Sequence, residues 1–124
     1  MTDQQPVGHF RAIDIDSYHM HFKPEDHVLV QAAAGGVGTA LVQLLRLKGC
    51  TIYGTAGSDA KLDYLRQQGV HHPINYTTSD FEQVIKEKLG TRGLDVVFDS
   101  LGGKSFSKGF RSLGKGGRII GYGA

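Results

Sequence analysis

A glycine-rich turn is the feature of this 124-residue sequence most able to do chemistry. It follows a short apolar run, Val28–Val30, and leads directly into a helical pattern that ends near Lys48. The turn reads Ala33-x-Gly35-x-x-Gly38, with alanine at the first of the three positions usually held by glycine. Such a turn places backbone N–H groups and a helix N-terminus where a pyrophosphate can sit. The first hypothesis is therefore a nucleotide-binding site, and the alternative is a purely structural strand–helix turn.

The two glycines of this turn have different expected roles. Gly35 lets the backbone approach a phosphate, because a Cβ at this position would stand between the chain and the ligand. Gly38 lets the new helix pack closely against the strand. Gly49 is placed to end the helix in the left-handed conformation. The apolar residues in between recur at the spacing of one helix face: Val37, Ala40, Leu41, Leu44 and Leu45.

Strand and helix patterns alternate along the rest of the chain. Because Pro73 has no N–H, its strand is expected at the edge of a sheet or to begin there. The alternation predicts one α/β domain over residues 24–124, a Rossmann-type doubly wound parallel sheet of about five strands with helices on both faces. The expected elements are a strand over Thr51–Thr55, a helix capped by Ser58 and running to about Gln68, a strand over Pro73–Tyr76, a helix behind the capping box Ser79–Glu82 and closed by Gly90, a strand over Leu94–Asp99, a short helix marked by Phe106, Phe110 and Leu113, a turn over Gly114–Gly117, and a strand over Arg118–Tyr122.

Composition excludes several classes of function. A net charge of +2, carried by scattered lysines and arginines, does not favour nucleic-acid binding. Cys50 is the only cysteine, so it forms no internal disulfide and is expected to fill the core. Residues 1–23 are interpreted as a polar leader; His19 and His21 have a spacing that metal ligands can have, but no metal site is expected. The sequence contains no signal peptide or spanning segment, which predicts a cytoplasmic protein without membrane contact.

The residues after the second strand indicate which nucleotide would bind. Where this type of turn binds NAD, an acidic residue about 20 positions on usually holds the ribose 2′-hydroxyl. Counting from Gly35 reaches Thr55–Gly57, where there is no carboxylate. Hydroxyl and ammonium groups suit a 2′-phosphate, which favours NADP(H). The groups offered here are Gly54, Thr55, Ser58 and Lys61, although Ser58 could be only a helix cap and Lys61 only a solvated side chain.

Several strings along residues 24–124 resemble the medium-chain dehydrogenase/reductase superfamily. They are the turn over residues 32–38, Gly54–Ala56, Lys61, Ile74–Tyr76, Asp99–Gly103 and Gly117–Gly123. Within the superfamily, the chain is most similar to the zinc-independent NADPH:quinone oxidoreductase branch, including its vesicle-amine-transport-like members. The resemblance implies hydride transfer from NADPH to a quinone or enone-type substrate, with the chemistry supplied by the cofactor.

The resemblance also implies roles for the residues at matching positions. The pyrophosphate would lie against Ala33, Ala34, Gly35, Gly36, Val37 and Gly38. The 2′-phosphate would be surrounded by Ser58, Lys61 and Tyr76, with Lys61 pairing to it directly. The path toward the nicotinamide would be lined by Asp99, Ser100 and Leu101 and by Gly121, Tyr122 and Gly123. Taken alone, Tyr76 could instead be an aromatic that covers a sheet edge.

Members of this family are much longer than the present chain, and two expectations follow. The sheet would stop before its sixth strand, and the chain alone would be catalytically incomplete, with its catalytic residues unknown. Arg118–Tyr122 would then be an edge strand that pairs with a second copy or is covered by the leader. A non-catalytic nucleotide-binding or sensing module and a folding fragment with little affinity remain as alternative interpretations.

Overall fold

The computed structural model describes residues 22–122. Most of the predicted leader and Gly123 lie outside the described residues. The elements are β1 (His27–Val30), α2 (Gly36–Lys48), β2 (Thr51–Ala56), α3 (Asp59–Gln68), β3 (His72–Asn75), α4 (Phe81–Leu89), the 3₁₀ turn η1 (Gly90–Arg92), β4 (Leu94–Asp99), α5 (Gly103–Arg111) and β5 (Leu113–Gly121).

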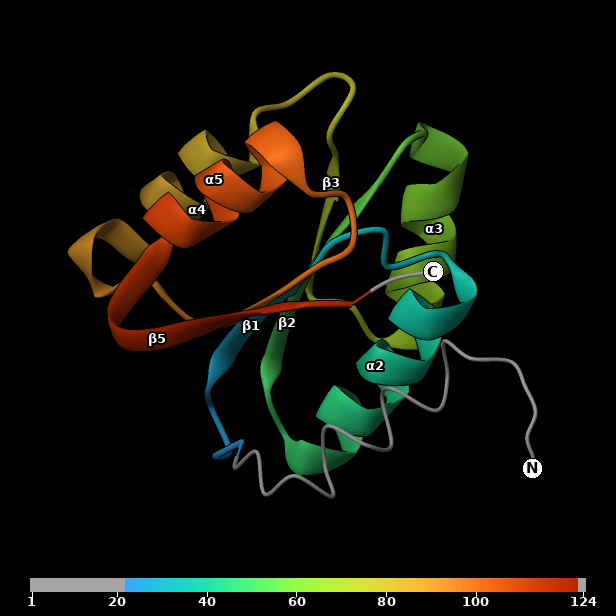
Figure 1. Cartoon of the computed structure of the whole chain (residues 1–124). Coiled ribbons are helices and arrows are strands. Elements are labelled where there is room, and N and C mark those ends of the chain that lie inside the picture. The colour runs from blue at the N-terminus through green and yellow to red at the C-terminus, as the bar shows by residue number, and fades with distance from the viewer. Residues whose placement is uncertain (1–21, 123–124) are drawn as a thin grey trace.

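The strands form one parallel sheet in the order β3-β2-β1-β4-β5. The helices α2 and α3 lie on one face of the sheet, and α4 and α5 lie on the other (Figure 1). Strand order reverses direction at β1, between β2 and β4, which is the switch point of a doubly wound fold. The predicted α/β class, parallel sheet and two helical layers are confirmed.

Side chains of the central strand β1 point alternately to the two faces of the sheet and belong to two separate hydrophobic cores. Val28 and Val30 pack with the residues of α2 and α3, among them Leu41 and Leu65. Leu29 points to the other face, where it belongs to a cluster that also contains residues of α4, β2 and β4. The apolar run of β1 is therefore explained by burial on both faces, as expected for a central parallel strand. This burial fixes the position of the turn that follows β1.

Helix and strand ends agree with most of the predicted boundaries. Ser58 caps α3 by accepting a hydrogen bond from the Lys61 N–H at 3.4 Å. The predicted capping box is wrong, because the N-cap of α4 is Asp80, whose carboxylate accepts from the Glu82 N–H at 3.1 Å. A carboxylate one position nearer the helix replaces the Ser79 hydroxyl in this role. The strand that contains Pro73 lies at the edge of the sheet, as expected.

The region before β5 differs from the prediction. The helix α5 ends at Arg111, and Leu113 already belongs to β5. Phe106 and Phe110 are 39% and 60% exposed, so their spacing did not mark the buried face. The helix instead approaches the sheet through Gly109, where a Cβ would lie 3.0 Å from Val97 Cγ1. A small residue, which contributes little to a hydrophobic pattern, makes this contact.

The predicted turn over Gly114–Gly117 is an irregular part of β5. Leu113 pairs with Leu94, and Arg118 pairs with Val96, so the glycine-rich residues between them face the single residue Asp95. Backbone lies directly on backbone here: a Cβ on Gly93 would be 2.6 Å from Gly114 Cα. Glycine is therefore required by the close approach of the two strands.

Candidate functional site

The sheet brings the predicted site residues to one edge. The turn follows the carboxyl end of β1, Ser58 follows β2, Tyr76 follows β3, and Ser100 follows β4. Tyr122 follows β5. In an open parallel sheet, ligands bind outside the carboxyl ends of the strands, at the switch point. The position of the candidate site therefore follows from the topology alone.

The start of α2 presents free hydrogen-bond donors to this edge. Gly35 is the N-cap, with an extended backbone, and its carbonyl accepts from the Thr39 N–H at 2.8 Å. The preceding N–H groups, of Gly36, Val37 and Gly38, have no acceptor among residues 22–122. The first turn of α2 contains no acidic side chain. Free N–H groups and the positive end of a helix dipole are the features with which helix N-termini bind anions.

The two fingerprint glycines occupy different surroundings. A Cβ on Gly38 would lie 2.7 Å from Ala33 Cα, so Gly38 permits a close approach of α2 to the backbone of the turn after β1. A Cβ on Gly35 would meet only the Ala32 carbonyl oxygen, at an ordinary 3.4 Å, and one on Gly36 would meet no atom within 4 Å. The protein itself therefore has room for a Cβ at Gly35. No close approach within the described residues requires glycine there.

Polar groups from β2, α3 and β3 gather beside this turn. Ser58 and Lys61 belong to the start of α3, and Lys61 is exposed without an ion pair in the described part of the chain. Tyr76 is 47% exposed, and its hydroxyl lies over Gly57, where a Cβ would be only 3.0 Å from that oxygen. These side chains can surround a phosphate group that extends from the turn.

Asn75 lies in the string Ile74–Tyr76 that resembles the family, but the sequence predicted no role for its side chain. It is buried, and its amide Nδ2 donates to the Asp59 carboxylate at 3.0 Å. Asp59 is the first acid after β2, and this bond ties its exposed carboxylate toward β3. Ser58 and Lys61 lie beside it at the start of α3.

On the other side of the switch point, Asp99 has an internal role. Its carboxylate accepts from the Gly102 N–H and from the Ser105 hydroxyl, both at 2.7 Å, and the side chain is buried. These bonds fix the loop between β4 and α5, on which Leu101 is 50% exposed. Asp99 therefore fixes the loop on this side of the switch point, and Leu101 is an exposed apolar residue of that loop.

Tyr122 also supports the crevice from within. Its N–H donates to the Asp99 carbonyl at 2.8 Å, and its hydroxyl donates to the carbonyl of Gln31. Burial raises the pKa of the Tyr122 phenol above its ordinary value, so the hydroxyl stays protonated and keeps donating at neutral pH. The predicted residue is at the site, but as a tie between β5 and the end of β1.

Gly54 and Thr55 lie beneath the turn. Thr55 is fully buried; its hydroxyl accepts from the Ala32 N–H at 3.2 Å and donates to Gln31 Oε1 at 2.6 Å. A Cβ on Gly54 would lie 3.0 Å from the Cβ of Ala33. Both residues were selected from the sequence as candidates for the phosphate. The structure uses them to support the turn from below.

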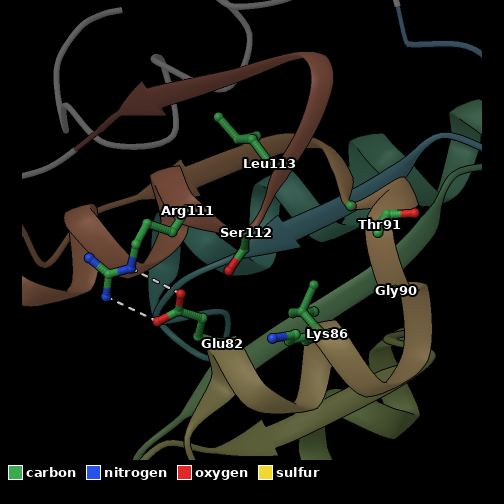
Figure 2. Close-up of a pocket in the computed structure, with 9 residues that line it drawn as sticks. Glu82, Lys86, Gly90, Thr91, Arg111, Ser112 and Leu113 are labelled. Carbon is green, nitrogen blue, oxygen red and sulfur yellow. Dashed lines mark hydrogen bonds and ion pairs between the residues drawn. The ribbon is translucent and has the colours of Figure 1, made fainter.

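A pocket of about 700 Å³ lies apart from these residues. It is bounded by α4, η1, the end of α5 and the start of β5, and the Arg111 guanidinium pairs there with the Glu82 carboxylate through two bonds of 3.0 Å (Figure 2). None of the predicted cofactor-binding residues lines it. The free N–H groups and the topology place the candidate site at the strand ends, away from this pocket.

Comparison with known proteins agrees with this geometry. Residues 36–124 match the model of a family described as zinc-binding dehydrogenase. The chain belongs to this family. It is the nucleotide-binding part of a medium-chain dehydrogenase/reductase, as the sequence predicts. Within residues 22–122, no group of three or more His, Cys, Asp or Glu side chains is arranged to hold a metal ion.

Individual members of the family are closely similar to the chain. The 2-haloacrylate reductase of Burkholderia sp is 43% identical over 101 residues, which are 82% of this chain and 30% of that protein. The synaptic vesicle membrane protein VAT-1 homolog of Danio rerio is 44% identical over 120 residues, 96% of this chain and 24% of that protein. The chain therefore spans about a quarter to a third of the length of these curated relatives.

Solved structures of the family share the fold. The nucleotide-binding subdomain of the enoylreductase domain of PpsC from Mycobacterium tuberculosis superposes with a TM-score of 0.85 at 36% identity. The superposition covers 95% of this chain and 66% of that one. None of the helices in the described part of this chain is long and apolar enough to cross a membrane.

Proposed function

We propose that this chain is the NADP(H)-binding domain of a reductase of the quinone-oxidoreductase type. Bound NADPH would supply a hydride for a quinone or an enone-type double bond, and the chain would bind and orient the cofactor. The observation that carries the proposal is the set of free N–H groups of Gly36, Val37 and Gly38 at the switch point. Named reductases among the relatives, such as 2-haloacrylate reductase and the enoylreductase domain, support the reaction class.

The residues present fit a nicotinamide dinucleotide phosphate. The N–H groups at the start of α2 would hold the pyrophosphate, as part of the turn Ala33–Gly38. The 2′-phosphate would accept from the hydroxyls of Ser58 and Tyr76 and pair with the ammonium of Lys61. The nicotinamide half would extend past Ser100 and Leu101 toward Gly121, Tyr122 and Gly123.

The choice of NADP(H) over NAD(H) rests on charge. Lys61 is exposed and has no ion pair in the described range, so its ammonium is available to a phosphate. The Asp59 carboxylate accepts from Asn75 Nδ2, which ties it toward β3 but leaves it charged and exposed. The 2′-phosphate would meet the ammonium of Lys61 and the hydroxyls of Ser58 and Tyr76.

The partner surface proposed for this domain is the edge strand β5. It pairs with β4 on one side, and within residues 22–122 no strand pairs with its other side. Ile119 and Ile120 are half-buried on this strand. An open edge with apolar side chains is a template for a second strand. We propose a homodimer in which the β5 strands of two copies pair, in a cytoplasmic protein with no nucleic-acid partner.

The proposed binding site is tested directly by nuclear magnetic resonance. Titration of the ¹⁵N-labelled chain with NADPH is expected to shift the amide resonances of Gly36, Val37 and Gly38 most strongly. Resonances of the pocket around Glu82 and Arg111 are expected to stay in place. Shifts confined to that pocket, with an unchanged turn, would overturn the assignment of the site. Dimerisation is checked separately by sedimentation, where a monomer at micromolar concentration with fast amide exchange at Ile119 and Ile120 would contradict it.

A further inference from the structure

Gln31 is a polar side chain in a position where an apolar one would be expected. It follows the apolar strand β1 directly and is 0% exposed. Its Oε1 accepts from the Thr55 hydroxyl at 2.6 Å, but its Nε2 has no acceptor in the described part of the chain. An unpaired buried donor destabilises a fold, so a residue that carries one calls for an explanation.

The backbone of Gln31 joins neighbouring strands. Its N–H donates to the Phe98 carbonyl of β4 at 2.9 Å. Its carbonyl accepts from the hydroxyl of Tyr122, at the end of β5. With the Thr55 contact on β2, the carboxyl ends of β2, β4 and β5 all meet this one residue. Gln31 therefore links the carboxyl ends of the three strands that neighbour or follow β1 at the switch point.

The next residue explains why this point matters. Ala32 has a φ of 52°, in the left-handed region that residues with a Cβ rarely adopt. Its N–H donates to the Thr55 hydroxyl at 3.2 Å, and that hydroxyl donates to Gln31 Oε1. A short chain of hydrogen bonds thus runs from the strained residue through Thr55 to Gln31. Such strain persists only where the surroundings hold it.

We propose that Gln31 is a positioning residue for the cofactor, which holds Ala32 left-handed through Thr55 and thereby aims the N–H groups of Gly36–Gly38. This inference rests on the proposed nucleotide function. Gln31 touches no part of the crevice surface itself, because it is fully buried. Its effect must therefore pass through the turn. Since every nicotinamide nucleotide shares the pyrophosphate, Gln31 sets the affinity for NADPH and NADH by the same factor, in contrast to Lys61.

Stability and affinity can be separated at this position. Gln31→Met keeps the length of the side chain and removes one hydrogen bond, to Thr55. The same change removes the unpaired Nε2 donor, whose burial is unfavourable, so the two effects on stability oppose each other. The midpoint of unfolding is therefore expected to change little. Affinity for both nucleotides is expected to fall about 10-fold, as the turn loses its support.

The experiment combines titration with hydrogen exchange on the full chain. Wild type, Gln31→Met and Thr55→Val are titrated with NADPH and NADH, and Thr55→Ser serves as the conservative control that keeps the hydroxyl. Both disruptive variants are expected to lose affinity for NADPH and NADH by the same factor. The affinities of Thr55→Ser are expected to stay within about 2-fold of those of wild type. Unchanged affinities in Gln31→Met, or a loss for only one nucleotide, would overturn the proposal.

Hydrogen exchange supplies a readout that does not need the cofactor. The Ala32 amide is expected to exchange at least about 10-fold faster in Gln31→Met, because it loses the supported acceptor on Thr55. The Leu29 amide, in the central strand, is the internal control and is expected to keep its rate. Equal acceleration at both sites, or none at Ala32, would contradict a positioning role. If wild type binds neither nucleotide, the proposed function fails, and the Ala32 rate still decides whether Gln31 holds the turn.

Discussion

Reversal of the charge at Lys61 separates the proposed phosphate contact from the fold. Ser58 is the N-cap of α3, and Lys61 is the third residue of the helix. In Lys61→Glu, the new side chain completes the pattern of a capping box and places a negative charge at the positive end of the helix. The fold is therefore expected to gain about 0.3–1 kcal/mol in the free energy of unfolding. NADPH binding is expected to weaken at the same time.

The expected loss of NADPH affinity has two parts. A charge-assisted contact to phosphate is worth about 1.5 kcal/mol at an exposed position. A carboxylate about 5 Å from a doubly charged phosphate adds about 1.5 kcal/mol of repulsion in an environment close to water. Together they predict that Lys61→Glu binds NADPH about 100-fold more weakly than wild type does. Its affinity for NADH, which has no 2′-phosphate, is expected to change less than about 3-fold. Lys61→Gln should show the first part alone, about 10-fold.

Calorimetric titration and urea unfolding measure the two effects on the same protein. Lys115→Glu, an exposed lysine in the irregular part of β5, is the control with the same change in net charge. It is expected to leave the ratio of the NADPH and NADH dissociation constants unchanged. The reasoning is refuted if Lys61→Glu weakens both nucleotides by the same factor, or if Lys115→Glu alters their ratio as much.

Further variants and conditions test other parts of the account. Gly35→Val should lower the unfolding midpoint only slightly, because φ is −76° and the Cβ has room although valine is a poorer N-cap than glycine, yet it should lose at least about 10-fold in nucleotide affinity by calorimetry; unchanged binding would argue against the pyrophosphate site. Gly38→Ala should lower the free energy of unfolding by about 1–3 kcal/mol in urea, because its Cβ meets the Ala33 backbone; a neutral effect would contradict the close packing. Burial raises the pKa of the Cys50 thiol to about 11, so iodoacetamide at pH 8 should label the native protein far more slowly than the unfolded one, and equal rates would be inconsistent with its core position. Burial, with smaller contributions from nearby cations, lowers the pKa of His27 and His72 below 6.5, so the unfolded state takes up protons first as pH falls. The free energy of unfolding should therefore be highest above pH 6.5 and decrease below it, and stability that is equal at pH 7.5 and pH 5.5 would refute this.

Much of the fold could be predicted because the spacing of apolar residues and the positions of helix-ending glycines, caps and prolines indicate the same elements along the chain. The apolar run of β1 predicted burial on both faces, and Pro73 predicted a strand that lies at the sheet edge or begins there; the structure has β1 buried on both faces and β3 at the edge. Patterns failed where small residues make the contacts. Gly109 carries the packing of α5, so the spacing of Phe106 and Phe110 was misleading.

The site could be located from the sequence, but its internal support could not. Fingerprint glycines identify the turn because their backbone is itself the binding surface. Gln31 and Asn75 act through hydrogen bonds to residues far away in the sequence. Gln31 belongs to no predicted motif, and the string that contains Asn75 predicted no role for its side chain. One signal was present: Gln31 is a polar residue directly after a buried strand. Parallel register places it beside Thr55 and Asp99, which only the pairing of β1 with β2 and β4 shows.

The central claim is that this domain binds NADP(H) in preference to NAD(H). Calorimetric titration of the purified wild-type chain with NADPH and, in parallel, with NADH tests it most directly. The account predicts saturable binding of NADPH and about 10-fold weaker binding of NADH, because only NADPH offers a phosphate to Lys61. Equal affinity for the two nucleotides, or binding of neither, would contradict it.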